Sequence, residues 1–299
     1  MIIQPAFSTR RFTAIVLSAL ANLVLGASSL YWRALDGLSP ATLVAYRIVL
    51  SCLILSALLL VFRRLSQINQ LTAKLILLHG TASIFIAVNW VTFMGASING
   101  YILESGIGYL LAPFIPIALG ALIYHEQFSA IKTLSTAIAL VAILLLITFT
   151  EKLNHWVYLL IAATWGVYTY LKKYTPLNAV TGLFLETVFL SSCLVVAVWL
   201  FDFPIIWPSE VSYRSAPLIW LAGAVSVTPL LMFSFATGKI PLSLTGFLQF
   251  ILPLTLLAIG LITNGKNIPA LSLTLIISTT GVLVCLLTYD SLTTRSPGE

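Results

Sequence analysis

Charged residues are scarce in this chain. Only 8% of its 299 residues are Asp, Glu, Lys or Arg, whereas 60% are hydrophobic and the mean hydropathy is +1.05. Soluble domains carry about 25% charged residues, and a soluble protein of this length needs them to cover its surface. The composition therefore excludes a soluble enzyme, a nucleic-acid-binding domain and a disordered chain. It indicates a polytopic protein whose main partner is the lipid bilayer.

Residue patterns for catalysis and metal binding are also lacking. The three cysteines, Cys52, Cys193 and Cys285, lie in apolar runs without CxxC spacing or a histidine partner, so no disulfide framework or metal site is predicted. His125-Glu126 lacks the second histidine of a zinc-peptidase motif. There is neither a Gly-x-Ser-x-Gly turn nor a phosphate-binding loop. We therefore expect no enzyme, no cofactor and no ATP motor within this chain.

Long apolar runs fill most of the sequence. A helix needs about 20 apolar residues to cross a bilayer, and the runs do not alternate as barrel strands would. The fold class predicted is an all-α membrane protein with ten transmembrane helices. The ten segments are 12–32, 41–62, 75–97, 101–124, 130–150, 155–171, 179–201, 214–236, 241–263 and 269–289.

The distribution of basic residues predicts the orientation. Ten spans place both termini on the same side of the membrane. Of the 15 Lys and Arg residues, ten fall on the side of the termini, four fall on the other side, and Arg47 falls inside a span. Because cytoplasmic loops are enriched in Lys and Arg, we expect both termini in the cytoplasm and the protein in the inner or plasma membrane.

The two halves of the sequence resemble each other at an offset of 139–140 residues. Pro113, inside the fourth segment, corresponds to Pro253 in the ninth, and Arg47 corresponds to Glu186. A repeat of five spans forces the second copy to insert upside down, as in many secondary transporters. We therefore expect two inverted five-helix repeats, residues 1–150 and 151–299, with a solute site near the membrane midplane between them.

Ionisable residues inside the spans are rare, and each is informative. Such a group costs about 2.5–3.5 kcal/mol at the centre of a helix. Arg47 and Glu186 could form a buried ion pair that locks the halves together, or they could bind a carboxylate and an ammonium or proton of a zwitterionic solute. Glu104 lies near the outer side, where its side chain could instead reach water. His79 is expected at the inner end of the third segment.

Amides and aromatic side chains are the other candidates for a solute site. Asn89 and Gln249 each need a hydrogen-bonding partner within the membrane, which another helix or a solute could supply. Trp90, Trp165 and Tyr168 could serve in packing or line a pocket for an amphipathic solute.

Small residues and prolines mark positions where helices approach closely or bend. Gly108 lies four residues before Ala112, which gives a small face for helix contact. Pro113, Pro229 and Pro253 each leave a backbone carbonyl unbonded and can kink a helix. The kinks could support rocking between two states or could be static bends.

The chain resembles the drug/metabolite transporter superfamily of EamA type, and within it the RarD-like branch. The resemblance covers essentially all ten segments. It rests on Asn89-Trp90, Leu103-Glu104-Ser105, Gly108-Tyr109, Pro113, Gly120, His125-Glu126, Trp165-Gly166-x-Tyr168, Leu185-Glu186-Thr187, Pro229-Leu230-Leu231, Pro241-Leu242-Ser243 and Gly246-Phe247-Leu248-Gln249. It implies a central cavity between inverted repeats and transport of small organic metabolites, often amino-acid-like, without ATP hydrolysis.

The sequence thus predicts an alternating-access carrier of small organic solutes, amino-acid-like or amphipathic. A receptor or assembly subunit and a lipid scramblase are the alternatives. A coupling proton carried by Glu186 is a further hypothesis, and the sequence gives no oligomeric state. The side chains expected to line the site are Arg47, Asn89, Trp90, Glu104, Tyr109, Trp165, Tyr168, Glu186 and Gln249.

Overall fold

The computed structural model describes residues 9–35, 37–62, 71–99, 101–150, 153–201, 205–206 and 216–264. All regular secondary structure in these ranges is helical, as the composition predicts. The helices are α1 Thr9–Arg33, α2 Pro40–Val61, α3 Ala73–Ile98, α4 Ile102–Leu111, α5 Phe114–Leu122, α6 Ala130–Phe149, α7 His155–Tyr174, α8 Ala179–Phe201, α9 Ala216–Ile219, α10 Ala222–Thr237, α11 Leu242–Gln249 and α12 Ile251–Asn264.

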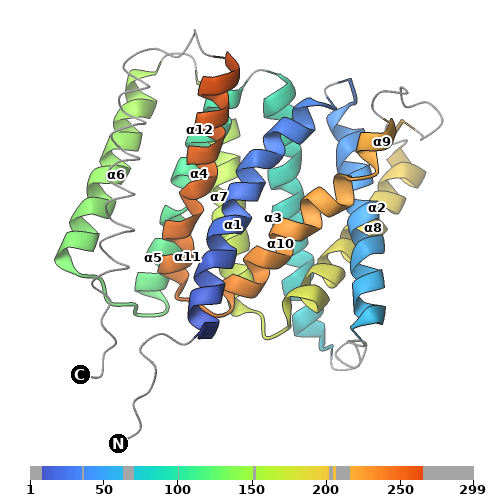
Figure 1. Cartoon of the computed structure of the whole chain (residues 1–299), viewed down its shortest axis with the longest axis horizontal. Coiled ribbons are helices and arrows are strands. Elements are labelled where there is room, and N and C mark those ends of the chain that lie inside the picture. Colours follow the sequence, from blue (N-terminus) through green and yellow to red (C-terminus); the bar gives the residue numbers. More distant parts are fainter. Residues whose placement is uncertain are drawn as a thin grey trace, which may run out of the picture.

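The helices run up and down through a single bundle (Figure 1). Eight segments in the described ranges are long and apolar enough to cross a membrane. They are Thr9–Arg33, Pro40–Val61, Ala73–Ala96, Leu103–Leu122, Lys132–Phe149, Ala179–Leu200, Pro217–Thr237 and Leu242–Ile259. The chain is therefore an all-α, multi-pass membrane protein. The predicted tenth segment, 269–289, lies outside the described residues.

Helix α7 forms where the sixth segment was predicted, but it is not among those eight. It is 20 residues long and packs against α3 and α4. Its buried residues include the polar Thr164, Tyr168, Thr169 and Lys172. These side chains lower the hydropathy of α7, and they face the protein interior, where polar groups find partners.

Two predicted segments are broken at or near proline. The fourth divides into α4 and α5 at Ala112–Pro113, and the ninth divides into α11 and α12 at Phe250. A proline has no N–H to give the carbonyl four residues earlier, so Pro253 leaves the carbonyl of Gln249 without its helical partner. Pro229, in contrast, lies inside the continuous helix α10.

Glycines allow the helices of the centre to pack closely. A Cβ on Gly108 in α4 would lie 2.8 Å from the Cβ of Ile161 in α7. A Cβ on Gly166 in α7 would lie 2.6 Å from the Cβ of Ile115 in α5. Close backbone approach of this kind is a usual source of helix association in membranes. It fixes α7 against both parts of the broken fourth segment.

Candidate functional site

Two small cavities lie in the centre of the bundle, and Trp90 of α3 borders both. We call the first the Arg47 cavity; it has a volume of about 20 Å³. Its walls are Leu25, Ser28, Trp32, Arg47, Asn89, Trp90, Phe93, Tyr109, Trp165, Leu252 and Leu256. We call the second the Glu186 cavity; it has a volume of about 10 Å³. Its walls are Ser51, Leu55, Ile86, Trp90, Tyr168, Leu183, Glu186, Thr187, Leu190, Val227 and Leu230. Neither has room for an organic solute, since about 10–15 Å³ is what a single water needs.

Arg47 is a buried cation that has no counter-ion among the described residues. Its residue is 4% exposed, and its Nε has no hydrogen-bonding partner. Among the described residues, no side chain or carbonyl forms a hydrogen bond or ion pair with it. The guanidinium carbon instead lies 3.7 Å from the ring centroid of Trp90 and 5.2 Å from that of Trp32. Such contacts contribute about 2 kcal/mol when desolvated, less than the several kcal/mol that removing an ion from water costs.

Asn89 holds three helices together beside Arg47. Its Nδ2 donates to Thr164 Oγ1 of α7 at 3.1 Å, and its Oδ1 accepts from the Tyr109 hydroxyl of α4 at 2.9 Å. The sequence did not show which groups bond to the side-chain amide of Asn89; the structure shows that α7 and α4 provide them. Asn89 and Tyr109 form part of the cavity wall in a fixed orientation.

Trp165 lies at the centre of the aromatic wall. Its ring stacks on Tyr168 at a centroid distance of 5.7 Å, contacts Phe233 at 5.3 Å and meets Tyr109 edge-on at 6.2 Å. Its residue is 3% exposed, and its indole N–H has no acceptor. The walls of the Arg47 cavity thus carry two N–H donors, Arg47 Nε and Trp165 Nε1, that no protein group satisfies.

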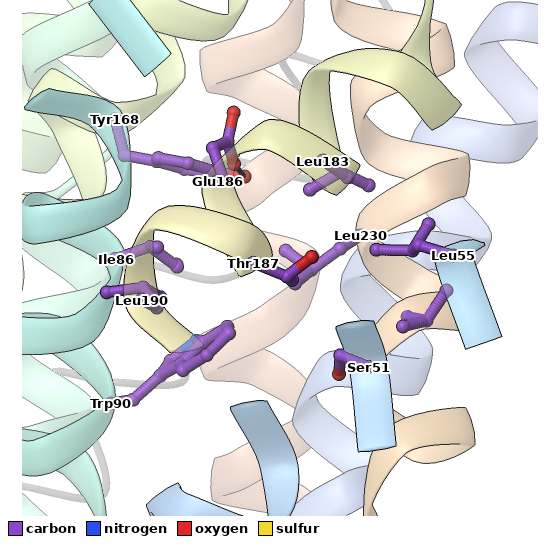
Figure 2. Close-up of a pocket in the computed structure, with 11 residues that line it drawn as sticks. Ser51, Leu55, Ile86, Trp90, Tyr168, Leu183, Glu186, Thr187, Leu190 and Leu230 are labelled. Atoms are coloured by element: carbon purple, nitrogen blue, oxygen red, sulfur yellow. Dashed lines mark hydrogen bonds between the residues drawn. The ribbon is translucent and has the colours of Figure 1, made fainter. Parts of the chain in front are cut away.

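Glu186 lies at one end of the second cavity, beside Tyr168, and Trp90 lies at the other end (Figure 2). Its carboxylate is surrounded by donors. Lys172 Nζ lies 2.8 Å from Oε1, His79 Nδ1 lies 2.9 Å from Oε1, and the Tyr168 hydroxyl donates to Oε2 at 3.1 Å. The buried carboxylate is therefore neutralised and solvated by three side chains from α3 and α7.

These contacts bear on three readings of the sequence. Of the two alternatives left open for Arg47 and Glu186, the direct ion pair is not formed, because each side chain lies in its own cluster. His79 lies near the start of α3, where it was expected, but it is 1% exposed and bridges Glu186 to the hydroxyl of Thr175. Lys172 is one of the ten basic residues counted on the side of the termini, but it lies in the last turn of α7, is 3% exposed and is bound to Glu186.

Two further candidates lie outside both cavities. Glu104 is 7% exposed and accepts a hydrogen bond from the backbone N–H of Asn154, just before α7, at 3.3 Å. The amide nitrogen of Gln249 bonds to the Thr169 hydroxyl, whereas its Oε1 has no partner. The other seven predicted residues all border one cavity or both. Those seven are Arg47, Asn89, Trp90, Tyr109, Trp165, Tyr168 and Glu186.

Sequence reasoning missed Trp32 as the second aromatic partner of Arg47, and Lys172 as the partner of Glu186. The repeat gave no signal for either. At the offset of 139 that relates Arg47 to Glu186, Trp32 corresponds to Leu171 and Lys172 corresponds to Arg33. Within the described residues, no group of three His, Cys, Asp or Glu side chains could hold a metal ion.

Known proteins resemble the chain over most of its length, although no family model matches it. An uncharacterized transporter of Pseudomonas aeruginosa is 30% identical over 265 residues, which cover 87% of this chain and 88% of the relative. The uncharacterized transporter YojE of Bacillus subtilis is 29% identical over 253 residues, covering 83% and 84%. Protein RarD of Escherichia coli is 25% identical over 258 residues, covering 85% and 86%.

One solved crystal structure has the same fold, with a TM-score of 0.66 at 16% identity, covering 95% of this chain and 99% of the other. Together with the relatives' names, this defines the class of protein as a multi-pass membrane transporter. The chain belongs to the drug/metabolite transporter superfamily of EamA type, in its RarD-like branch.

Proposed function

We propose that this protein is a secondary transporter that carries small organic solutes across the inner or plasma membrane by alternating access, without ATP. The observation that carries the proposal is the Arg47 cavity. A buried cation with no counter-ion is unfavourable, and intramembrane ionisable groups usually mark a solute pathway. The cavity lies where α1, α2, α3, α4, α7 and α12 meet, so any rearrangement of these helices changes it.

The proposed architecture is ten helices in two inverted repeats, 1–150 and 151–299. Helix packing supports it. If α1 corresponds to α7, α2 to α8 and α3 to α10, then the contact of α1 with α10 has its counterpart in the contact of α7 with α3. The contact of α2 with α10 likewise matches that of α8 with α3. The contact of α4 with α7 matches that of α11 with α1, and the contact of α5 with α7 matches that of α12 with α1.

Individual positions support the same correspondence at an offset of 140 residues. Gly26 in α1 packs against Thr255 of α12, and Gly166 in α7 packs against Ile115 of α5. The helix breaks near Pro113 and Pro253 correspond as well. Two structurally similar halves make the inward-open and outward-open states near-equivalent in energy, which a carrier needs.

The small size of both cavities fits an occluded state. In this proposal the cavities widen alternately toward each side of the membrane, and the breaks near Pro113 and Pro253 allow the broken helices to bend. Breaks of this kind are tolerated within a membrane only where other groups replace the lost hydrogen bond.

The proposed orientation has both termini in the cytoplasm. The start of α1, the start of α3, the end of α7 and the end of α10 lie at the same end of the bundle (Figure 1). Lys74 and Lys173 lie in those regions, together with Arg10, Arg11 and Lys239. Lys172 is buried and so does not belong among the ten basic residues counted on the side of the termini. Without it, that side still carries more Lys and Arg than the other side.

The proposed coupling ion is a proton carried by Glu186. Its carboxylate lies in a cavity wall, and His79 and Tyr168 contact it with groups that can exchange protons. Protonation of Glu186 would remove the charge that Lys172 now neutralises, which would loosen α7 from α8.

Counterflow in proteoliposomes tests the proposed function. Vesicles holding the purified protein are preloaded with a mixed pool of amino acids and organic acids, and uptake of a labelled member of each class is followed. The wild type is compared with Arg47→Ala and Glu186→Gln, after each variant has been shown to be folded. Transient accumulation of label by the wild type, and its loss in folded Arg47→Ala, is the expected result.

The rival functions give different outcomes in the same vesicles. A receptor would bind solute at saturation and move none across the sealed membrane. A scramblase would equilibrate a fluorescent lipid between leaflets and show no counterflow. Either result would overturn the carrier proposal.

A further inference from the structure

Among the described residues, the buried side chains in and beside the two cavities carry more positive than negative charge, since Arg47 and Lys172 are cations and Glu186 is the single carboxylate. This excess limits the charge of the solute that the site can bind. Three carboxylates occur among the described residues: Glu104, Glu126 and Glu186. Glu104 accepts the backbone N–H of Asn154. Glu126 accepts the first backbone N–H groups of α11, from Leu242 at 2.7 Å and from Ser243 at 2.9 Å. Of these three, only Glu186 borders either of the two cavities described above.

Glu186 has no net charge left to neutralise a solute's ammonium group. The ion pair with Lys172 cancels its charge, and His79 shares the same oxygen atom. The Tyr168 hydroxyl donates to the other oxygen. From the remaining helices packed on α8, the cavity walls are Ser51 and Leu55 of α2 and Val227 and Leu230 of α10, none of which is charged. An incoming ammonium would have to displace Lys172, which would itself become a buried unpaired cation.

The aromatic rings offer no second place for an ammonium group. Cation–π binding needs a free ring face. The guanidinium of Arg47 lies over Trp90 and near Trp32, and Trp165 is covered by Tyr168 and Phe233. The rest of the wall holds no charged side chain, and it includes the apolar residues Leu25, Leu252 and Leu256.

We propose that the Arg47 cavity selects a carboxylate that has an apolar or aromatic body and no ammonium group. This inference rests on the proposed carrier function and narrows its substrate class from amino-acid-like or amphipathic solutes to apolar monoanions. The carboxylate neutralises Arg47, whose planar guanidinium suits two parallel hydrogen bonds. The unpartnered indole N–H of Trp165 supplies a further donor in the same wall.

Matched pairs of probes test the inference, because the members of each pair differ only in the ammonium group. The pairs are 3-phenylpropanoate with phenylalanine, and hexanoate with norleucine. Dissociation constants are measured on the purified full-length protein by intrinsic tryptophan fluorescence, which reports on Trp32, Trp90 and Trp165 in the cavity wall. We expect the plain carboxylate of each pair to bind at least tenfold more tightly than the amino acid.

Variants assign the preference to Arg47. Arg47→Gln should abolish carboxylate binding, and Arg47→Lys should retain part of it, because the charge remains while the planar fork is lost. Lys74→Gln is the matched control; it removes one positive charge from an exposed site at the start of α3 and should leave every dissociation constant unchanged. A melting curve for each variant shows that it is folded.

The outcomes separate this inference from the carrier proposal. Equal or tighter binding of the amino acids in both pairs would overturn the inference, whereas counterflow of those amino acids would leave the carrier proposal standing. Failure of both carboxylates to bind at millimolar concentration would also overturn the inference. Carboxylate binding that survives in Arg47→Gln would overturn it as well.

Discussion

Replacing Glu186 by Gln leaves the ammonium of Lys172 buried without a counter-ion. The two side chains are 2.8 Å apart and each is 2% exposed. Breaking such a pair from one side destabilises a protein by about 3–5 kcal/mol, because the surviving charge is neither solvated nor neutralised. We therefore expect Glu186→Gln and Lys172→Met each to lower the free energy of unfolding by about 3 kcal/mol or more.

The double variant Glu186→Gln/Lys172→Met should be more stable than either single variant. It contains no buried unpaired charge at this position, and methionine has nearly the length of lysine. Replacement of a buried pair by uncharged groups is often neutral, so we expect its stability to lie within about 1 kcal/mol of the wild type. The non-additivity is then about 5 kcal/mol in a double-mutant cycle.

Thermal denaturation of the purified variants in one detergent measures this cycle. A loss of 1 kcal/mol lowers the melting temperature by about 2–4 °C in a protein of 150–250 residues, so each single variant should melt about 6 °C or more below the wild type. Single variants that melt with the wild type, or a double variant whose loss is the sum of the single losses, would refute the ion pair as described here.

Three further predictions concern packing, capping and pH. Gly108→Ala should destabilise the protein by about 1–3 kcal/mol, because its Cβ would lie 2.8 Å from the Cβ of Ile161; Gly106→Ala, which meets nothing within 4 Å, should not lower the melting temperature. Glu126→Gln should lower stability by about 1 kcal/mol, because a neutral amide replaces the carboxylate that caps α11; an unchanged melting curve would contradict this cap. Glu186→Gln should give counterflow that no longer varies with pH, and a pH profile like that of the wild type would eliminate Glu186 as the proton carrier.

Within the described residues, the sequence predicted the helices well because their signal is local. A run of about 20 apolar residues predicts a span wherever it occurs, and α2 and α8 begin and end within two residues of the predicted limits. Proline likewise breaks or kinks a helix through its own missing N–H. This is why the divisions near Pro113 and Pro253 fall in the predicted segments.

The partners of the buried charges were not predictable in the same way. Lys172 ends a helix beside Lys173, and sequence position alone places both in water. Its actual environment depends on how α7 packs against α8, which brings it to Glu186 at a separation of 14 residues. The separation of Arg47 from Glu186 likewise depends on how the helices pack, which places the two residues in different cavities.

The predicted aromatic residues all border a cavity, whereas of the two predicted amides Asn89 does and Gln249 does not. Trp90, Trp165 and Tyr168 border the cavities because large rings fill the space where several helices diverge. Gln249 was proposed from its polarity, but polarity requires only a partner, and the Thr169 hydroxyl of α7 provides one.

Accessibility of the Arg47 cavity from both sides of the membrane tests the central claim most directly. Ser28 lines this cavity and is suited to a single reporter, Ser28→Cys, in a chain whose native cysteines Cys52, Cys193 and Cys285 are replaced by alanine. A membrane-impermeant maleimide is applied to one side of sealed vesicles of either orientation. The account predicts labelling from both sides, with each reaction slowed by a bound carboxylate. Labelling from one side alone, or from neither, would contradict an alternating-access carrier.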